Sequence, residues 1–237
     1  MFSNKDLRNM IVPLFMEQFL VMLVGIIDTF VVSYVGEAAV SGVSLVNSFN
    51  TIFIYLFTAL ASGGAVVISQ YLGSKDQNNT VKSSSQLLMF STLFSIVLGI
   101  LVLIFSQSLL SFLFGKVETS VMDACMTYLK ISAYSYPALA IYNAGAAMYR
   151  SMTKTSTTMY LSIVSNIINV IGNMIGVFVL HAGVAGVAYP SLIARAFSAI
   201  VITILLFNKK YEAHYVKEWL FKFDFSLLKK DVKYCDS

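Results

Sequence analysis

Long stretches of the chain carry almost no charge, and they constrain the fold more than any other feature of the sequence. Residues 11–27, 87–105 and 193–207 contain one charged side chain or none. A bilayer core is about 30 Å thick, and a helix needs about 20 apolar residues to cross it. Because backbone amides and carbonyls must be paired in lipid, such segments cross as helices. The sequence therefore predicts an all-α, polytopic membrane protein.

Six membrane-spanning helices are predicted, forming one six-helix bundle over residues 1–207. Their ranges are about 10–34, 43–71, 85–105, 121–148, 157–180 and 184–207. The composition agrees, because only 12% of the residues are charged, about half the usual content of a soluble domain. Residues 208–237 form a basic and aromatic tail or a linker. Its rings either lie at the membrane interface or are solvated with the rest of the tail: Trp219, Phe221, Phe223 and Phe225.

The placement of Lys and Arg predicts the orientation. Of the 16 basic residues, all but Lys116, Lys130 and Arg195 lie in the terminal segments or in the loops near 72–84 and 149–156. Basic loops remain in the cytoplasm. We therefore expect a multi-pass protein of the cell membrane with both termini cytoplasmic. Its surroundings are the lipid bilayer, and the net charge of +4 requires no nucleic-acid partner.

Ionisable and amide side chains inside the predicted spans are the best candidates for a functional site, since they are rare in lipid. Asp28, Asn173 and Ser191 each lie eight residues from an outer loop, which places them at one depth, about 12 Å below the surface. Asn169 precedes Asn173 by one turn on the same helix face. Oxygen-bearing side chains in such a layer can surround Na⁺ or a proton. Asp28 can then exchange a proton for Na⁺ or for a cationic substrate.

Other residues in the spans leave alternatives open. Asp28 can instead form a structural ion pair with Arg195 or Lys130. Glu17 either helps to admit substrate or extends to the interface. Asn166 is expected to bond to a neighbouring helix, and the spacing of Gly172 and Gly176 favours close helix packing. Pro190 cannot donate to the carbonyl of Gly186, which leaves that acceptor free near Ser191.

No enzyme motif and no catalytic residue is predicted, and no cofactor is expected beyond a coupling ion. The sequence has no nucleophile elbow, no phosphate-binding loop and no His-Glu-x-x-His. Cys125 and Cys235 fall on opposite sides of the predicted membrane, so a disulfide within one chain is excluded.

Several short runs, taken in order, resemble the multidrug and toxic compound extrusion (MATE) family. They are residues 13–18 (PLFMEQ), 25–29 (GIIDT), 34–36 (YVG), 69–76 (SQYLGSKD), 149–151 (YRS) and 183–188 (GVAGVA). The resemblance implies one lobe of a two-lobe, twelve-helix exporter of organic cations or drugs, driven by Na⁺ or H⁺.

The resemblance also implies where the cation binds: Asp28, Asn169, Asn173 and Ser191. Asn173 stands where a carboxylate can occur in the family, and Ser191 where Thr is usual. Glu17 and Arg195 become candidates for the substrate path. One lobe alone cannot enclose a central cavity, so the expected partner is a second six-helix lobe or another copy of the chain. The alternatives are a lipid-linked sugar or polysaccharide flippase of the same superfamily, and an inactive membrane fragment.

Overall fold

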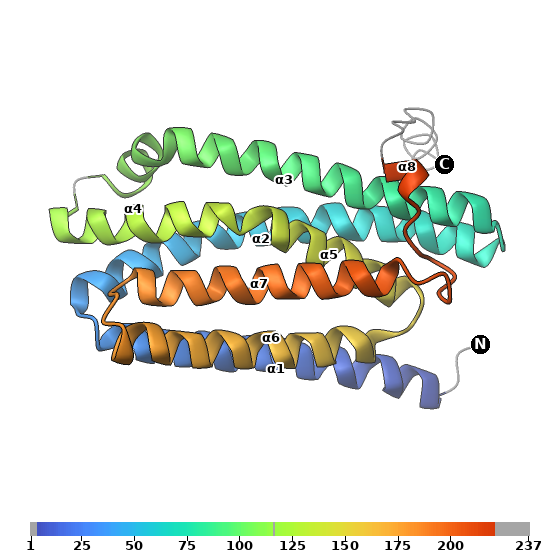
Figure 1. Cartoon of the computed structure of the whole chain (residues 1–237), viewed down its shortest axis with the longest axis horizontal. Coiled ribbons are helices and arrows are strands. Elements are labelled where there is room, and N and C mark those ends of the chain that lie inside the picture. Colours follow the sequence, from blue (N-terminus) through green and yellow to red (C-terminus); the bar gives the residue numbers. More distant parts are fainter. Residues whose placement is uncertain (1–3, 116, 221–237) are drawn as a thin grey trace.

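A computed structural model describes residues 4–115 and 117–220. Figure 1 shows an elongated bundle in which the long helices run side by side along one axis. The helices are α1 (Asn4–Ser33), α2 (Glu37–Gly73), α3 (Gln77–Phe114), α4 (Thr119–Tyr134), α5 (Tyr136–Ser151), α6 (Thr155–Met174), the π-helical turn η1 (Ile175–Val179), α7 (Ala185–Leu206) and α8 (Lys217–Leu220). These residues contain no strand, which confirms the all-α, polytopic fold class.

Five helical segments of the described chain are long and apolar enough to cross a membrane. They correspond to the first, second, third, fifth and sixth of the six predicted spans, with α6 and η1 forming one segment, and the fourth predicted span is not among them. Helices α2 and α3 are longer than predicted, at 37 and 38 residues, or about 55 Å at 1.5 Å per residue. Apolar patterning detects only the part of a helix that lies in lipid. The polar ends continue beyond it, and α3 begins where the Asp76 side chain accepts from the amide of Asn79.

The fourth span differs from its prediction, because it is not one helix over 121–148. It consists of α4 and α5, which are separated at Ser135. Pro137 lies in the first turn of α5, where it has no amide proton to donate to the carbonyl of residue 133. The Ser135 hydroxyl donates to the Ser132 carbonyl at 2.7 Å and closes the last turn of α4. The break places Ser135 inside the bundle.

Helices α6 and α7 approach each other more closely than side chains normally allow. A Cβ built on Gly172 would lie 2.6 Å from the Cβ of Pro190. A Cβ on Gly176 would overlap the carbonyl of Gly186. The prediction that these two glycines permit close packing is confirmed, and their partners are Pro190 and Gly186.

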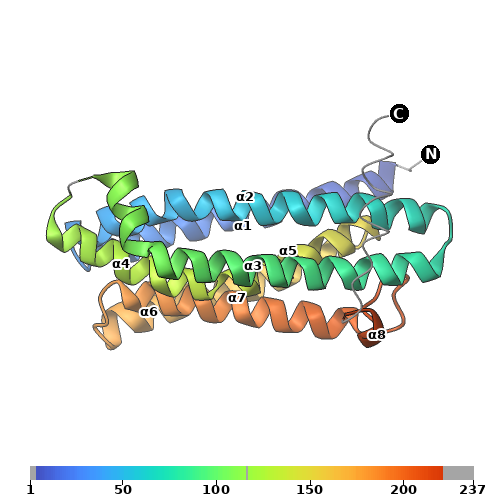
Figure 2. The ribbon, with the colours of Figure 1, turned by 90° about the horizontal axis from the view of Figure 1, so that it is seen from above.

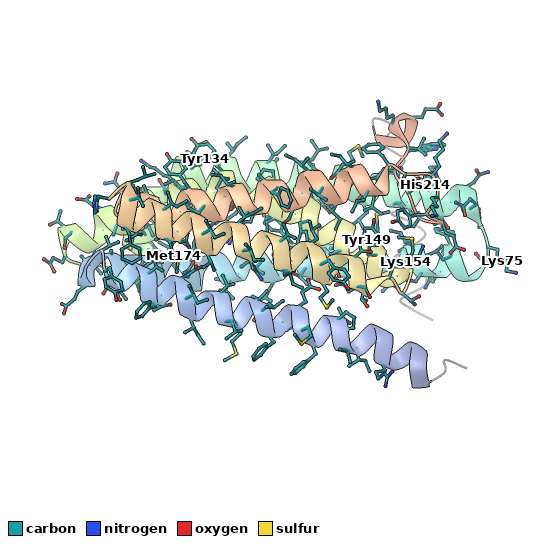
Figure 3. The ribbon with its side chains drawn as sticks, turned by 60° about the horizontal axis from the view of Figure 1, so that its bottom comes forward. Lys75, Tyr134, Tyr149, Lys154, Met174 and His214 are labelled. Atoms are coloured by element: carbon teal, nitrogen blue, oxygen red, sulfur yellow. The ribbon has the colours of Figure 1, made fainter. Side chains whose placement is uncertain are left out.

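The start of α1, the loops α2–α3 and α5–α6, and α8 all lie at one end of the bundle (Figures 1 and 2). Lys75, Lys154 and His214 lie there as well, as Figure 3 shows. We call it the basic end. The segment 208–216 packs against this end, where Tyr215 donates its amide to the Leu206 carbonyl and Val216 donates to Ser85 Oγ. Of the predicted tail, Phe221, Phe223, Phe225 and Cys235 lie outside the described residues.

The outward faces of the helices differ in chemistry. Helix α3 exposes large apolar side chains along its length, and α1 does the same: Ile11, Val12, Phe15, Met16, Phe19, Val21, Met22, Leu23, Ile26 and Phe30. Helix α2 exposes large apolar side chains too, Ile52, Tyr55, Leu56 and Val66, but it also exposes a series of small hydroxyl residues: Ser41, Ser44, Ser48, Ser62 and Ser69. The faces of α1 and α3 suit contact with lipid tails, whereas the face of α2 suits contact with protein or water.

Candidate functional site

The four predicted cation-site residues lie together on three helices. Asn173 Nδ2 donates to Asp28 Oδ1 at 2.6 Å and to Asn169 Oδ1 at 3.2 Å. Asn169 Nδ2 donates to Ser191 Oγ at 2.9 Å. The Ser191 hydroxyl proton goes to the Val187 carbonyl at 3.1 Å. These contacts form one hydrogen-bonded layer, which we call the Asp28 layer, from α1 through α6 to α7.

The local sequence explains how the layer is held. Asn169 and Asn173 are four residues apart, so their side chains share one face of α6. The glycines on this helix bring it against α7, and Gly172 packs on Pro190, directly beside Ser191. Asn173 is fully buried and Asn169 nearly so. Two amides are thereby fixed between the Asp28 carboxylate and the Ser191 hydroxyl.

One acceptor in this layer has no partner among the described residues. Asn173 Oδ1 is buried and receives no hydrogen bond within the described part of the chain. An unpaired buried acceptor is costly, by about 1–3 kcal/mol, and it lies on the same amide that contacts the Asp28 carboxylate. Hard cations such as Na⁺ take carboxylate, amide and hydroxyl oxygens as ligands. The residues present therefore fit a small cation as a transported species.

Glu17 lies in a second polar cluster, on α1, and its side chain is buried. Tyr142 of α5 donates its hydroxyl to Glu17 Oε1 at 3.2 Å, and Thr158 Oγ1 of α6 lies 3.3 Å from Oε2. A carboxylate held in this way does not extend to the interface, so that alternative is wrong. Thr158 also donates to the Thr155 carbonyl at 2.8 Å, and its single proton serves the shorter bond better.

Arg195 lies near the Asp28 layer without pairing directly with its carboxylate. Its Nη1 donates to Ser135 Oγ at 2.7 Å, at the break between α4 and α5. Its charge acts on Asp28 through space. Lys130 is exposed. Asp28 is therefore hydrogen-bonded by an amide rather than fixed in an ion pair with either cation.

Two other predictions, for Asn166 and for the Gly186 carbonyl, differ from the structure. Asn166 Nδ2 is buried without an acceptor in the described residues, so the predicted bond from this amide to a neighbouring helix is absent. The Gly186 carbonyl packs against Gly176 rather than joining the hydrogen bonds around Ser191.

Sequence reasoning missed the residues that bind Glu17 and Arg195. Tyr142, Thr158 and Ser135 are common residue types in membrane helices, and no spacing connects them to their partners. It also missed the buried bond from the Tyr136 hydroxyl to Asn50 Oδ1, at 2.7 Å. The one available signal was Pro137, which marks a helix break and hence a place where side chains can enter the bundle.

Comparison with known proteins decides the family. Residues 13–175 match the model of the MatE family. The chain belongs to the MATE family. It is 28% identical to an uncharacterized transporter, YisQ, of Bacillus subtilis over 204 residues, which are 84% of this chain and 44% of that protein. It is 24% identical to the multidrug export protein MepA of Staphylococcus haemolyticus over 88% of this chain and 46% of that protein.

Solved structures of MATE transporters share the fold. A MOP superfamily transporter from Pyrococcus furiosus superposes with a TM-score of 0.87 at 19% identity, over 96% of this chain and 50% of that one. A MATE transporter of the same superfamily in an outward-facing conformation gives the same TM-score and identity. The chain thus spans about half the length of the relatives that it matches, as one lobe does. It is an integral membrane protein of a family of transporters, not of enzymes.

Proposed function

We propose that this MATE lobe exchanges Na⁺ or H⁺ at Asp28 for cationic organic substrates and exports them across the cell membrane. The observation that carries the proposal is the Asp28 layer, in which a carboxylate, two amides and a hydroxyl meet on three helices. Similarity to multidrug exporters supports the substrate class. The coupling follows from competition, since one carboxylate neutralises one cation at a time.

In this proposal the residues around Asp28 have separate tasks. Asn173 holds the carboxylate in place and offers its free Oδ1 to an incoming cation. Asn169 and Ser191 complete the ring of oxygens. Arg195 favours release, because its positive charge repels a cation that occupies the layer. Glu17 lies on the same helix toward the basic end and attracts cations to the substrate path.

The second half of the proposal concerns the partner. Alternating access requires two units that move against each other around a central site. We place the contact with a second six-helix lobe, or with another copy of the chain, on the serine-rich face of α2. Small residues let helices approach closely. We place the basic end in the cytoplasm, following the positions of its lysines.

The coupling is tested by reconstituting the chain in vesicles and following a fluorescent organic cation under a proton or Na⁺ gradient. Asp28→Asn is expected to reduce driven transport to background, because the amide cannot exchange cations. The matched control is Asp123→Asn, which makes the same change at an exposed position on α4. Driven transport that continued undiminished in Asp28→Asn would exclude the role of this residue.

The partner is tested by disulfide cross-linking in membranes, in a chain whose Cys125 and Cys235 are replaced. Ser48→Cys on α2 is expected to cross-link to its partner, whereas Ile100→Cys on the apolar face of α3 is not. Equal cross-linking at both positions would show random collision. A chain that stays monomeric at every α2 position supports the inactive fragment. Driven transport of a lipid-linked sugar in preference to an organic cation supports the flippase.

A further inference from the structure

Glu17 is a buried carboxylate that no positive side chain accompanies among the described residues. Its side chain is 7% exposed. It contacts two hydroxyls, Tyr142 Oη at 3.2 Å and Thr158 Oγ1 at 3.3 Å. The three side chains come from α1, α5 and α6, and α1 runs alongside α6 (Figure 1). Buried charges in proteins are paired or bind a metal ion, so this carboxylate lacks the partner that its burial requires.

Basic residues on the helices around Glu17 do not pair with it in the described part of the chain. Arg8 lies nine residues earlier on α1 and is exposed. Lys154 places its Nζ over the ring of Tyr211, 4.6 Å from the centroid. Arg150 lies in the last turn of α5 and forms no ion pair with the carboxylate. Helix α6 carries no charged residue, and the charge on α2 lies at its opposite end. These helices therefore supply no direct positive partner.

Thr158 presents an acceptor rather than a donor to the carboxylate. Its single hydroxyl proton goes to the Thr155 carbonyl at 2.8 Å, the shorter of its two contacts. Two acceptor oxygens then lie 3.3 Å apart, which is longer than an O–H···O bond of about 2.5–3.0 Å. Two oxygens that bind one hard cation at about 2.4 Å each, at right angles, lie about 3.4 Å apart. The spacing fits a cation between these oxygens better than a shared proton.

Tyr142 adds a third oxygen without losing its bond to Glu17. Its hydroxyl donates to Oε1 and keeps oxygen lone pairs that a cation can use. The ligand set is thus one carboxylate and two hydroxyls, which are the oxygen ligands that hard cations prefer. A single carboxylate neutralises one positive charge and leaves a divalent ion half neutralised. The set therefore favours a monovalent ion such as Na⁺.

We propose that Glu17, Tyr142 and Thr158, which we call the Glu17 cluster, bind Na⁺ as a second cation site of this lobe. Glu17 and Asp28 are eleven residues apart on α1, or about 16 Å at 1.5 Å per residue, so each site can hold its own ion. The proposal rests on the proposed function only in placing Glu17 on the cation path. It goes beyond that function, because a lobe with two sites carries two positive charges in each cycle instead of one.

The number of sites is tested by equilibrium binding of radioactive Na⁺ to the 237-residue chain in a neutral detergent. Choline chloride keeps the ionic strength constant. We expect two Na⁺ per chain, and one in Glu17→Gln. A stoichiometry that Glu17→Gln leaves unchanged would overturn the second site, whatever happens at Asp28. A loss of one ion in Glu17→Gln but none in Asp28→Asn would exclude the role of Asp28 and support the Glu17 cluster.

A pair of variants at Thr158 separates ion binding from packing. Both are measured in the Asp28→Asn chain, so that only the Glu17 cluster binds Na⁺. Thr158→Val removes the hydroxyl oxygen and should weaken Na⁺ binding about tenfold. Thr158→Ser keeps the oxygen and should change binding less than about twofold. Equal weakening in the two variants would mean that the oxygen is not a ligand and would overturn the proposal. Thermal unfolding in choline chloride confirms that each variant is folded.

Discussion

Helix α1 carries two carboxyl groups that point into the bundle, the partly buried Asp28 and the buried Glu17, and their surroundings differ in a way that separates two roles. Asp28 accepts from an amide of α6, which also donates to a second amide, and that second amide donates to a hydroxyl of α7. Glu17 accepts a hydrogen bond from the Tyr142 hydroxyl, and the Thr158 hydroxyl lies 3.3 Å from its other oxygen. Both carboxyl groups face the same neighbouring helix, so the difference lies in the partner chemistry.

An amide N–H can only donate, whereas a hydroxyl can donate or accept. Asn173 therefore gives Asp28 a fixed N–H donor, and its own side-chain oxygen stays buried without a hydrogen-bond donor among the described residues. The hydroxyls around Glu17 can rotate to serve a carboxylate or a neutral acid. We therefore propose that the Asp28 layer holds a fixed geometry for a cation, while the Glu17 cluster adapts to either protonation state. Four changes test this distinction.

The largest expected effect comes from the contact that fixes the Asp28 layer. Gly176→Val places a side chain where the Gly186 carbonyl lies, and it should reduce the free energy of unfolding by about 3 kcal/mol. Thermal unfolding in detergent measures the change. Gly25→Val on α1 is the matched control, because a Cβ there meets nothing within 4 Å. Equal losses in both variants would show that the α6–α7 contact has no special importance.

The next effect concerns cation selectivity. Asn173→Asp places a second carboxylate beside Asp28, and we expect Na⁺ to bind about tenfold more tightly. The unfolding temperature in NaCl should then rise more for this variant than for the original chain, because a cation that binds the folded state stabilises it. Choline chloride at the same concentration controls for ionic strength. A similar rise in choline would contradict a specific site.

A smaller effect is expected at Glu17. Tyr142→Phe removes the hydroxyl that donates to Oε1 and should cost about 1 kcal/mol of unfolding free energy. In combination with Glu17→Leu, the two losses should be less than additive. Additive losses would show that the bond contributes nothing. Tyr55→Phe, at an exposed position on α2, provides the control.

The smallest effect is expected for Thr158→Val. The hydroxyl proton of Thr158 serves the Thr155 carbonyl at 2.8 Å, and its contact with Glu17 is longer. We expect a loss of about 0.5 kcal/mol, at the low end for one hydrogen bond. Denaturant unfolding can compare it with Tyr142→Phe. A larger loss for Thr158→Val would reverse the ranking of the two partners of Glu17.

The sequence predicts the helical crossings well because hydrophobicity in lipid is a local property of the chain. The gathering of Asp28, Asn169, Asn173 and Ser191 was also predictable, since distance along a helix converts directly into depth in a membrane. The partners of Glu17 could not be predicted, because packing decides how each helix is rotated about its own axis and therefore which side chains face each other. The break at Ser135 was missed because one proline produces it within an otherwise continuous apolar segment.

The glycine contacts between α6 and α7 have a mechanical consequence. Where two backbones touch without side chains between them, neither helix can slide or tilt independently, so the pair moves as one stiff hairpin. Helix α1, by contrast, presents most of its large side chains outward and packs mainly against α6. If the distance between Asp28 and the polar side chains of α6 and α7 changes, α1 must therefore be the helix that moves, because α6 and α7 stay fixed relative to each other.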